Sequence, residues 1–156
     1  MALEIEHKFL LKNNDWTKDI NKSTRYKQGY LTSDSKRSVR IRTSDNKAWL
    51  NIKSATIGTQ RQEYEYEIPF NEGEELLNTL CEKPLIEKVR HLVLHKKHTW
   101  EIDVFSGDNE GLVVAEIELT KIGEQFSKPA WLDKEVTDDL RYYNNQLCKY
   151  PYKKWR

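Results

Sequence analysis

The sequence predicts a mainly β domain (α+β class) with about eight antiparallel strands, closed into a barrel or folded as a two-sheet sandwich. Segments in which apolar and charged residues alternate recur along the chain, and alternation with a period of two is typical of strands with one buried face. Short polar connections separate these segments, as antiparallel neighbours require. Helical periodicity is confined to three short segments, so few helices are available to cover a sheet.

The expected strands alternate strictly. In the first of them, LEIEHKFLL, Glu4, Glu6 and Lys8 share one face, opposite Ile5 and His7. The polar links between strands are rich in Gly, Asp, Asn, Ser and Lys, which favour turns. Consecutive hairpins predict an antiparallel meander. In chain order the strands cover residues 3–11, 24–32, 36–43, 47–54, 61–69, 85–95, 98–105 and 111–120.

Helices are expected over residues 14–20, 71–83 and 137–147. The second places Leu76, Leu77 and Leu80 on one face, and the third begins with Thr137 as its N-cap. We expect these helices to cover apolar surface of the sheet.

Length and charge exclude several classes of protein. The 156 residues contain no Pro/Gly/Ser-rich linker, which predicts a single domain over residues 1–156 with a sizeable core. The balance of 26 basic against 25 acidic residues gives no support for a nonspecific nucleic-acid binder. The sequence contains no apolar run long enough for a bilayer span and no signal-peptide pattern, so we expect a cytoplasmic protein without a membrane partner.

Cysteine and histidine point to no structural site. Cys81 and Cys148 have neither the number nor the spacing of a disulfide framework or a zinc site, and we interpret them as reduced thiols. His91, His95 and His98 lie in a region predicted as strand, where their spacing does not favour a shared metal ion.

The charged strand faces are sorted by sign. One set of strands carries basic residues on its charged face, and another set carries acidic residues. If these faces met solvent, acids and bases would be mixed, so the sorting favours charged faces that point into a polar lumen. Buried charges there need partners. The basic residues are Arg40, Arg42, Lys53, Lys88 and Arg90; the acidic ones are Glu63, Glu65, Glu67, Glu101, Asp103, Glu116 and Glu118.

Such a lumen suits a chain of phosphates. Guanidinium and ammonium groups both match phosphate oxygens. The carboxylates would repel this anion unless divalent cations lay between them, and hard oxygen ligands favour Mg²⁺ or Mn²⁺. The sequence therefore predicts a metal-dependent polyphosphate site.

An ordered set of motifs also carries a family resemblance. EIEHK fits an E-x-E-x-K signature, followed in order by SVRIR, LNIK, RQEYEYEIP, LIEKVR, AEIEL and EVTDDLRYYNNQL. Along almost its whole length the chain resembles the CYTH superfamily of triphosphate tunnel metalloenzymes, in particular its small bacterial inorganic triphosphatases. The resemblance implies an eight-stranded antiparallel tunnel that binds a triphosphate end-on and uses Mg²⁺ or Mn²⁺.

The resemblance also implies roles for individual residues. Glu67 and Glu101 have a weaker claim, at the rim or in solvent, and His7 lies on the outer face. Which carboxylate orients the attacking water stays open. The implied metal ligands are Glu4, Glu6, Glu63, Glu65, Asp103, Glu116 and Glu118; the substrate-binding residues are Lys8, Arg40, Arg42, Lys53, Lys88 and Arg90; the catalytic residues are Lys8, Glu63, Glu65 and Lys88.

The expected activity is hydrolysis of tripolyphosphate to pyrophosphate and phosphate, with a small-molecule triphosphate as partner and homodimer formation left open. Thiamine triphosphatase, nucleoside triphosphatase and CYTH-type adenylate cyclase are alternatives, for which Tyr30, Trp49 or Trp131 would flank an entrance. A non-catalytic polyphosphate or nucleotide binding module and a structural barrel with a salt-bridged lumen are alternatives of other classes. The intact acidic pairs and Lys8 favour an enzyme.

Overall fold

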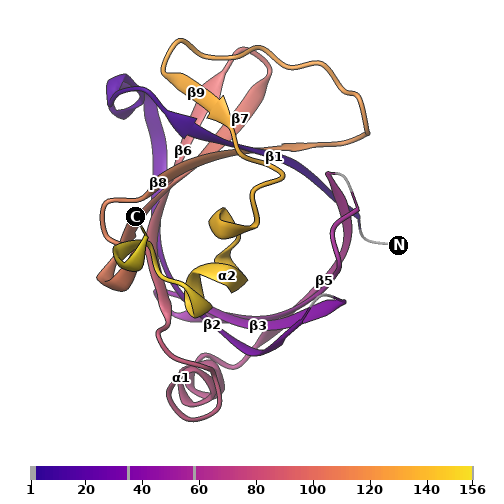
Figure 1. Cartoon of the computed structure of the whole chain (residues 1–156). Helices are drawn as coiled ribbons and strands as arrows, with labels where there is room; N and C mark the ends of the chain where they lie inside the picture. Colours follow the sequence, from indigo (N-terminus) through magenta and orange to yellow (C-terminus); the bar gives the residue numbers. More distant parts are fainter. Residues whose placement is uncertain (1–2, 35, 58, 156) are drawn as a thin grey trace.

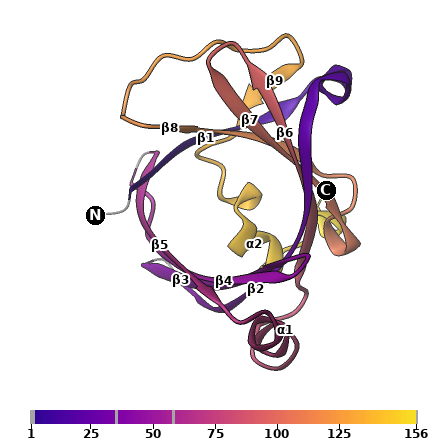
Figure 2. The ribbon, with the colours of Figure 1, turned by 180° about the vertical axis from the view of Figure 1, so that it is seen from behind.

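The computed structural model describes residues 3–34, 36–57 and 59–155, and the nine strands found among them form one sheet. The sheet runs β5-β4-β3-β2-β6-β7-β8-β1, and pairing of β5 with β1 closes it into the ring seen in Figures 1 and 2. The predicted closed antiparallel barrel is confirmed. The strands are β1 Leu3–Leu11, β2 Ile20–Ser33, β3 Arg37–Ser44, β4 Lys47–Ser54, β5 Gln60–Ile68, β6 Ile86–His95, β7 His98–Ser106, β8 Val113–Leu119 and β9 Leu132–Glu135.

The connectivity departs from a simple meander. Hairpins link β2, β3, β4 and β5 in sequence order, and in the same way β6, β7 and β8, as expected. However, β6 pairs with β2 and not with β5. The first strand lies between β5 and β8 and thereby removes the two free edges that a meander would leave. The short β9, which the sequence did not predict, lies outside the ring and pairs with the far end of β1, on the edge opposite β8.

The apolar faces of the strands point away from the lumen. Ile41, Ile86, Ile102 and Ile117 are fully buried, each in one of three apolar clusters that surround the barrel. Burying such a side chain contributes about 1.5–3 kcal/mol, so the barrel is stabilised from outside. The alternation that buries these residues turns the charged residues inward.

Helix α1 (Phe70–Thr79) covers the outer surface of β3 and β4, where Leu77 packs with Ile41. Leu80 is 64% exposed because the helix ends before it, so the predicted apolar face is shorter than expected. The short helix predicted over residues 14–20 is confirmed as a 3-10 turn at Asp15–Asp19, with Trp16 buried.

The segment between β8 and β9 covers another part of the barrel. Phe126 and Trp131 both meet the ring of Trp100 edge to face, with ring centroids 5.8 Å apart in each pair. The Nε2 atom of His98 lies 2.7 Å from a Glu124 carboxylate oxygen in the same segment. Trp131 therefore belongs to the outer core and, contrary to expectation, does not flank a substrate entrance.

The C-terminal segment lies across one end of the barrel. It comprises a 3-10 turn at Leu140–Tyr142, the helix α2 (Asn144–Lys149) and a 3-10 turn at Tyr152–Lys154. Both end-on views show α2 within the outline of the ring. The Gln28 amide of β2 donates to Asn144 Oδ1 at 2.8 Å and so ties the helix to the barrel interior.

Thr137 does not cap a helix, contrary to the prediction. Asp139 caps the first turn by accepting a hydrogen bond from the Arg141 backbone N–H. The Thr137 hydroxyl instead accepts the Lys8 backbone N–H at 3.0 Å, at a point where β1 passes from β5 to β9 and its N–H lacks a strand partner.

The remaining sequence features have local roles. Cys81 and Cys148 are free and buried. His91 Nδ1 lies 2.7 Å from the Ser23 hydroxyl. None of the helices in the described residues is long and apolar enough to cross a membrane.

Gly73 of α1 is expected to tolerate no side chain. A Cβ atom there would lie 2.5 Å from the Ala48 Cβ of β4, so Gly73→Ala should push the helix off the sheet. Overpacking of this kind costs about 1–3 kcal/mol and should outweigh the gain in helix propensity of up to about 1 kcal/mol. Denaturant unfolding should show a net loss for Gly73→Ala and almost none for the exposed Asn78→Ala; a stabilised Gly73→Ala protein would contradict this packing.

Candidate active site

The tunnel lumen is a polar cavity of about 300 Å³. Seven basic and seven acidic side chains line it. Except for Asp103, every site residue predicted from the sequence is among them. The charged lining consists of Glu4, Glu6, Lys8, Arg40, Arg42, Lys53, Arg61, Glu63, Glu65, Lys88, Arg90, Glu101, Glu116 and Glu118.

The strand order gives the cavity a basic wall and an acidic wall. The basic wall comprises β4, β3, β2 and β6. Its cations come from three of these strands, Lys53 from β4, Arg40 and Arg42 from β3, and Lys88 and Arg90 from β6. The acidic wall comprises β7, β8, β1 and β5. In this ring of eight strands, β3 lies opposite β8. Lys8 of β1 and Arg61 of β5 are the exceptions, because both are cations on the acidic wall.

Where the two walls meet, opposite charges pair across neighbouring strands. Lys53 is opposite Glu63 in the β4–β5 register, and its ammonium lies 3.2 Å from the carboxylate. Asn51, next along the same face, donates to Glu65 at 2.9 Å. Directly opposed residues are close enough for such contacts, so register alone creates these pairs.

Asp103 forms the second junction. Its two carboxylate oxygens accept hydrogen bonds from Arg90 Nε at 2.8 Å and Nη2 at 2.9 Å, and from Lys88 Nζ at 2.8 Å. Burial alone would raise the pKa of Asp103, but Arg90 and Lys88 lower it below its ordinary value. Asp103 is fully buried behind the lining. These contacts favour an anchoring role for Asp103 over the metal-ligand role expected from the sequence.

Lys88 and Arg90 are held in place by this carboxylate. Lys88 also donates to Asn144 Oδ1 at 3.0 Å, so α2 helps to position it. Burial lowers the pKa of Lys88 to about 7, with Asp103 opposing the shift and Arg90 adding to it.

The centre of the basic wall lacks acidic partners. Neither Arg40 nor Arg42 forms an ion pair with a described carboxylate, and buried Arg40 Nε has no described hydrogen-bond partner. Arg42 Nε donates to neutral Gln28 at 2.9 Å. Burial, followed by the charges of Arg40 and Arg90, lowers the pKa of Arg42 to about 10. Two crowded guanidinium groups are therefore available to an anion.

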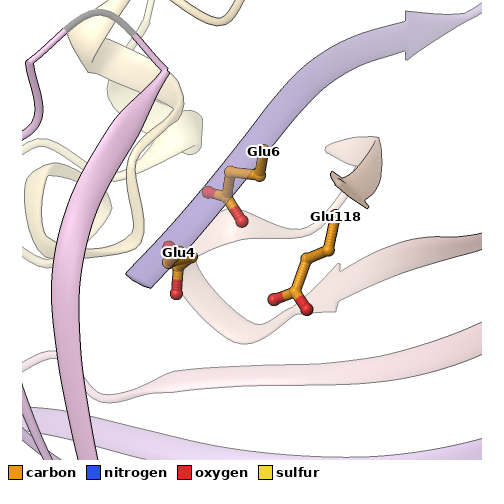
Figure 3. A group of neighbouring side chains, drawn as sticks. All are labelled: Glu4, Glu6 and Glu118. Atoms are coloured by element: carbon orange, nitrogen blue, oxygen red, sulfur yellow. The ribbon is translucent and has the colours of Figure 1, made fainter. Parts of the chain in front are cut away.

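The centre of the acidic wall shows the opposite imbalance. Carboxylate oxygens of Glu4, Glu6 and Glu118 lie within 4.8 Å of one another, and we call these residues the acidic trio. Figure 3 shows Glu118 of β8 turned toward the two glutamates of β1. Burial and the charges of Glu116 and Glu4 raise the pKa of Glu6 well above its ordinary value. Burial and neighbouring carboxylates raise the pKa of Glu118 to about 7 although its side chain reaches the open lumen.

Lys8 is the first exception on the acidic wall. It is opposite Glu116 in the β1–β8 register, and its ammonium lies 3.3 Å from that carboxylate and donates to the Tyr142 carbonyl at 3.3 Å. Burial opposes both ionised forms. Even so, Lys8 lowers the pKa of Glu116 to about 2, and Glu116 with Glu6 raises that of Lys8.

Arg61 is the second exception and was missed by the sequence analysis. It is opposite Glu4 in the β1–β5 register, and its Nε donates to Glu4 Oε1 at 2.8 Å. Lys53 donates to the other Glu4 oxygen at 3.0 Å. The signal was present, because Arg61 shares the period-two face of Glu63 and Glu65.

Other lining residues have weaker signals in the sequence. Glu101 lines the cavity and pairs with Arg90 at 3.3 Å, whereas Glu67 and Trp49 are not among the lining residues described. His7 lies outside, 2.6 Å from Glu135, as expected. Tyr30 lines the cavity. Strand periodicity could not identify the C-terminal contributors, which are Tyr143, Asn144 and Asn145.

Comparison with known proteins agrees with this architecture. The chain is 47% identical to an inorganic triphosphatase of Acetivibrio thermocellus over 156 residues, covering 100% of this chain and 99% of the relative. It is 32% identical to an inorganic triphosphatase of Nitrosomonas europaea over 149 residues, covering 93% and 96%. The crystal structure of the inorganic triphosphatase NE1496 superimposes with a TM-score of 0.68 at 32% identity, covering 95% of each chain.

A more distant structure shares the fold. The PH1012 protein from Pyrococcus horikoshii matches with a TM-score of 0.59 at 17% identity, covering 76% of this chain and 79% of its own. The model of the CYTH domain family matches residues 2–147. With its closed tunnel, its sorted charged walls and these relatives, the chain belongs to the CYTH domain family.

Proposed function

We propose that this protein is a metal-dependent inorganic triphosphatase, which hydrolyses tripolyphosphate to pyrophosphate and phosphate in the tunnel. The observation that carries the proposal is a pair of charged centres on opposite walls: Arg40 and Arg42 form no ion pair with a described carboxylate, and the three carboxylates of the acidic trio converge on one another. A polyanion bound together with a divalent cation would compensate both centres at once. The names of the two bacterial relatives support this substrate class.

The acidic trio fits a hard divalent cation. Its donors are all carboxylate oxygens, and the described lining contains neither cysteine nor histidine, a set that suits Mg²⁺ or Mn²⁺. Glu4, Glu6 and Glu118 would hold the ion. When bound, such an ion neutralises phosphate charge and lowers the pKa of coordinated water.

The basic residues would bind and orient the phosphate chain. Arg40 and Arg42 are free to form paired hydrogen bonds with phosphate oxygens. Lys88 and Arg90 are fixed by Asp103, and Lys8 by Glu116, so these cations are preorganised for charge that develops on the leaving phosphate. Glu63 and Glu65, at the edge of the acidic wall, are candidates for orienting the attacking water.

The aromatic residues favour an inorganic substrate over an organic triphosphate. Arg42 lies 4.5 Å from the centre of the Tyr26 ring, and Lys8 lies 4.9 Å from that of Tyr143. Tyr30 is buried and packs in the outer core. Among the described lining residues, therefore, each tyrosine ring has a cation beside it or packs in the core, an arrangement that disfavours stacking on a nucleobase or a thiamine ring.

Phosphate release from a panel of substrates tests the proposal. We expect turnover of tripolyphosphate with Mg²⁺ or Mn²⁺, little with ATP or thiamine triphosphate, poorer activity with Ca²⁺, and none in excess chelator until metal is restored. Tripolyphosphate that binds in calorimetry but is never cleaved would indicate a binding module instead. Undiminished activity in chelator would refute metal dependence.

A further inference from the structure

Arg61 lies against two of the carboxylates that are proposed to bind the metal ion. Its Nε donates to Glu4 Oε1 at 2.8 Å, and its Nη2 lies 3.8 Å from Glu6 Oε1. The ammonium of Lys53 takes the other Glu4 oxygen at 3.0 Å. Two members of the acidic trio thus already have a protein cation beside them, on the wall where basic residues are the exception.

We propose that Arg61 is an internal counter-cation, which compensates Glu4 beside Glu6 in the metal-free protein and transfers to the triphosphate when metal displaces it. The inference rests on the proposed function, because it requires both a metal ion and a polyanion in the same tunnel. Arg61 and Lys53 each hold one Glu4 oxygen, and a cation bound between the carboxylates of the acidic trio would repel the guanidinium beside it, so metal binding should weaken the Arg61–Glu4 contact.

Lys53 cannot play the same part. Its ammonium bridges Glu4 and Glu63, at 3.0 and 3.2 Å, and would keep Glu63 as a partner after losing Glu4. Both carboxylates beside Arg61 belong to the trio. A displaced Arg61 would therefore remain as an unpaired cation whose side chain is only 17% exposed.

A phosphate chain in the cavity is the anion that could satisfy the displaced guanidinium. Arg61 lines the same cavity as Arg40 and Arg42, and its planar fork suits two phosphate oxygens. The Tyr143 ring, 5.9 Å from the guanidinium carbon, offers a surface along which the group can move while it keeps a favourable contact. Metal binding would in this way supply the phosphate site with a further positive charge.

The proposal predicts effects of opposite sign on the two ligands. Without the guanidinium, metal no longer competes with Arg61 for Glu4, so Arg61→Gln should bind Mg²⁺ at least about tenfold more tightly than the wild type. A tenfold change corresponds to the contribution of one charge-assisted hydrogen bond. The same variant should show a KM for tripolyphosphate raised about tenfold. If Arg61 merely supported the tunnel, its replacement would weaken the binding of both Mg²⁺ and tripolyphosphate.

Isothermal titration of Mg²⁺ into the full-length protein without substrate is the primary measurement. It compares wild type, Arg61→Gln, Arg61→Lys and the control Arg141→Gln, which removes an exposed arginine paired with Asp139. Circular dichroism melts verify that each variant is folded. We expect the tightest binding in Arg61→Gln, an intermediate affinity in Arg61→Lys, and wild-type affinity in the control.

The outcomes separate this inference from the proposed function. Metal affinity that is unchanged or weaker in both Arg61 variants would overturn the internal counter-cation, even if the wild type hydrolyses tripolyphosphate. Wild-type protein that binds Mg²⁺ but releases no phosphate would refute the triphosphatase proposal, while tighter metal binding by Arg61→Gln would still support displacement of the guanidinium. If Arg61→Gln fails to fold, the charge-conserving Arg61→Lys decides the question.

Discussion

Replacement of Glu6 by glutamine should abolish most tripolyphosphate hydrolysis without destabilising the protein. Glu6 contributes a carboxylate to the acidic trio, and removal of a charge that organises the reaction should lower kcat/KM by about 10²–10³-fold. Glutamine keeps the size of the side chain but loses the negative charge that a divalent ion requires.

Although its activity falls, the Glu6→Gln variant should be at least as stable as the wild type. Burial and the nearby Glu116 and Glu4 raise the pKa of Glu6, so the folded protein binds this proton more tightly than the unfolded chain. An acid whose pKa is raised in the folded protein lowers the stability once the pH exceeds the pKa that the group has in the unfolded chain. Neutral glutamine removes that cost. At pH 7 we therefore expect a melting temperature equal to or above that of the wild type.

Phosphate release and thermal melts without metal check both parts of this prediction. Glu67→Gln is the matched control, because it changes an exposed carboxylate of β5 that is not among the described lining residues. A Glu6→Gln protein with wild-type kinetics would remove Glu6 from the site. A variant that lost activity because it unfolded would contradict the charge balance described for the acidic trio.

Replacement of Asp103 by asparagine should have the largest effect on stability. Asparagine fits the same space but leaves buried Lys88 and partly buried Arg90 without the anion that both contact. Loss of one partner from a buried ion pair costs about 3–5 kcal/mol. Denaturant unfolding at neutral pH should show a loss of this size.

Acid provides a second signature of the same carboxylate. Burial alone would raise the pKa of Asp103, but Arg90 and Lys88 hold it below its ordinary value. A depressed pKa contributes stability that is present at neutral pH and disappears as the pH falls and the carboxylate is protonated. The difference between wild type and Asp103→Asn should therefore shrink in acid.

Glu101→Gln is the control for this experiment. Glu101 contacts Arg90 at 3.3 Å and its side chain is 24% exposed, so we expect a loss of at most about 1 kcal/mol. If Asp103→Asn were as stable as the wild type and instead lost metal affinity, Asp103 would be a metal ligand, as the sequence alone had suggested.

Alternation along the strands predicted which charged residues share the lumen, because a period of two assigns each side chain to a face wherever one face is buried. It could not predict which of these residues meet. The pairing of Arg61 with Glu4 and of Lys8 with Glu116 depends on β1 lying between β5 and β8, a long-range closure that hairpin signals do not encode. For Asp103, alternation gave the face but not the partner: the register of β6 with β7 places it opposite Arg90, which favours anchoring over the expected contact with metal.

The C-terminal contribution was harder to foresee. Asn144 reaches the lumen because α2 crosses the end of the barrel, and nothing in helical periodicity indicates a tunnel beneath a helix. Thr137 looked like an N-cap because a polar residue followed by acidic ones commonly begins a helix. In the structure, the Thr137 hydroxyl instead accepts a hydrogen bond from the backbone N–H of Lys8.

The outward-facing core restricts which kinds of genetic change the protein can accept. Along β1, Phe9 is buried in the outer core next to Lys8, which faces the lumen. Loss or gain of a single codon within the strand would exchange the two faces, placing charges in the apolar clusters and isoleucine or phenylalanine in the tunnel. Length variation should therefore be confined to the connections between strands, and an in-frame deletion inside a strand should eliminate folding and catalysis together.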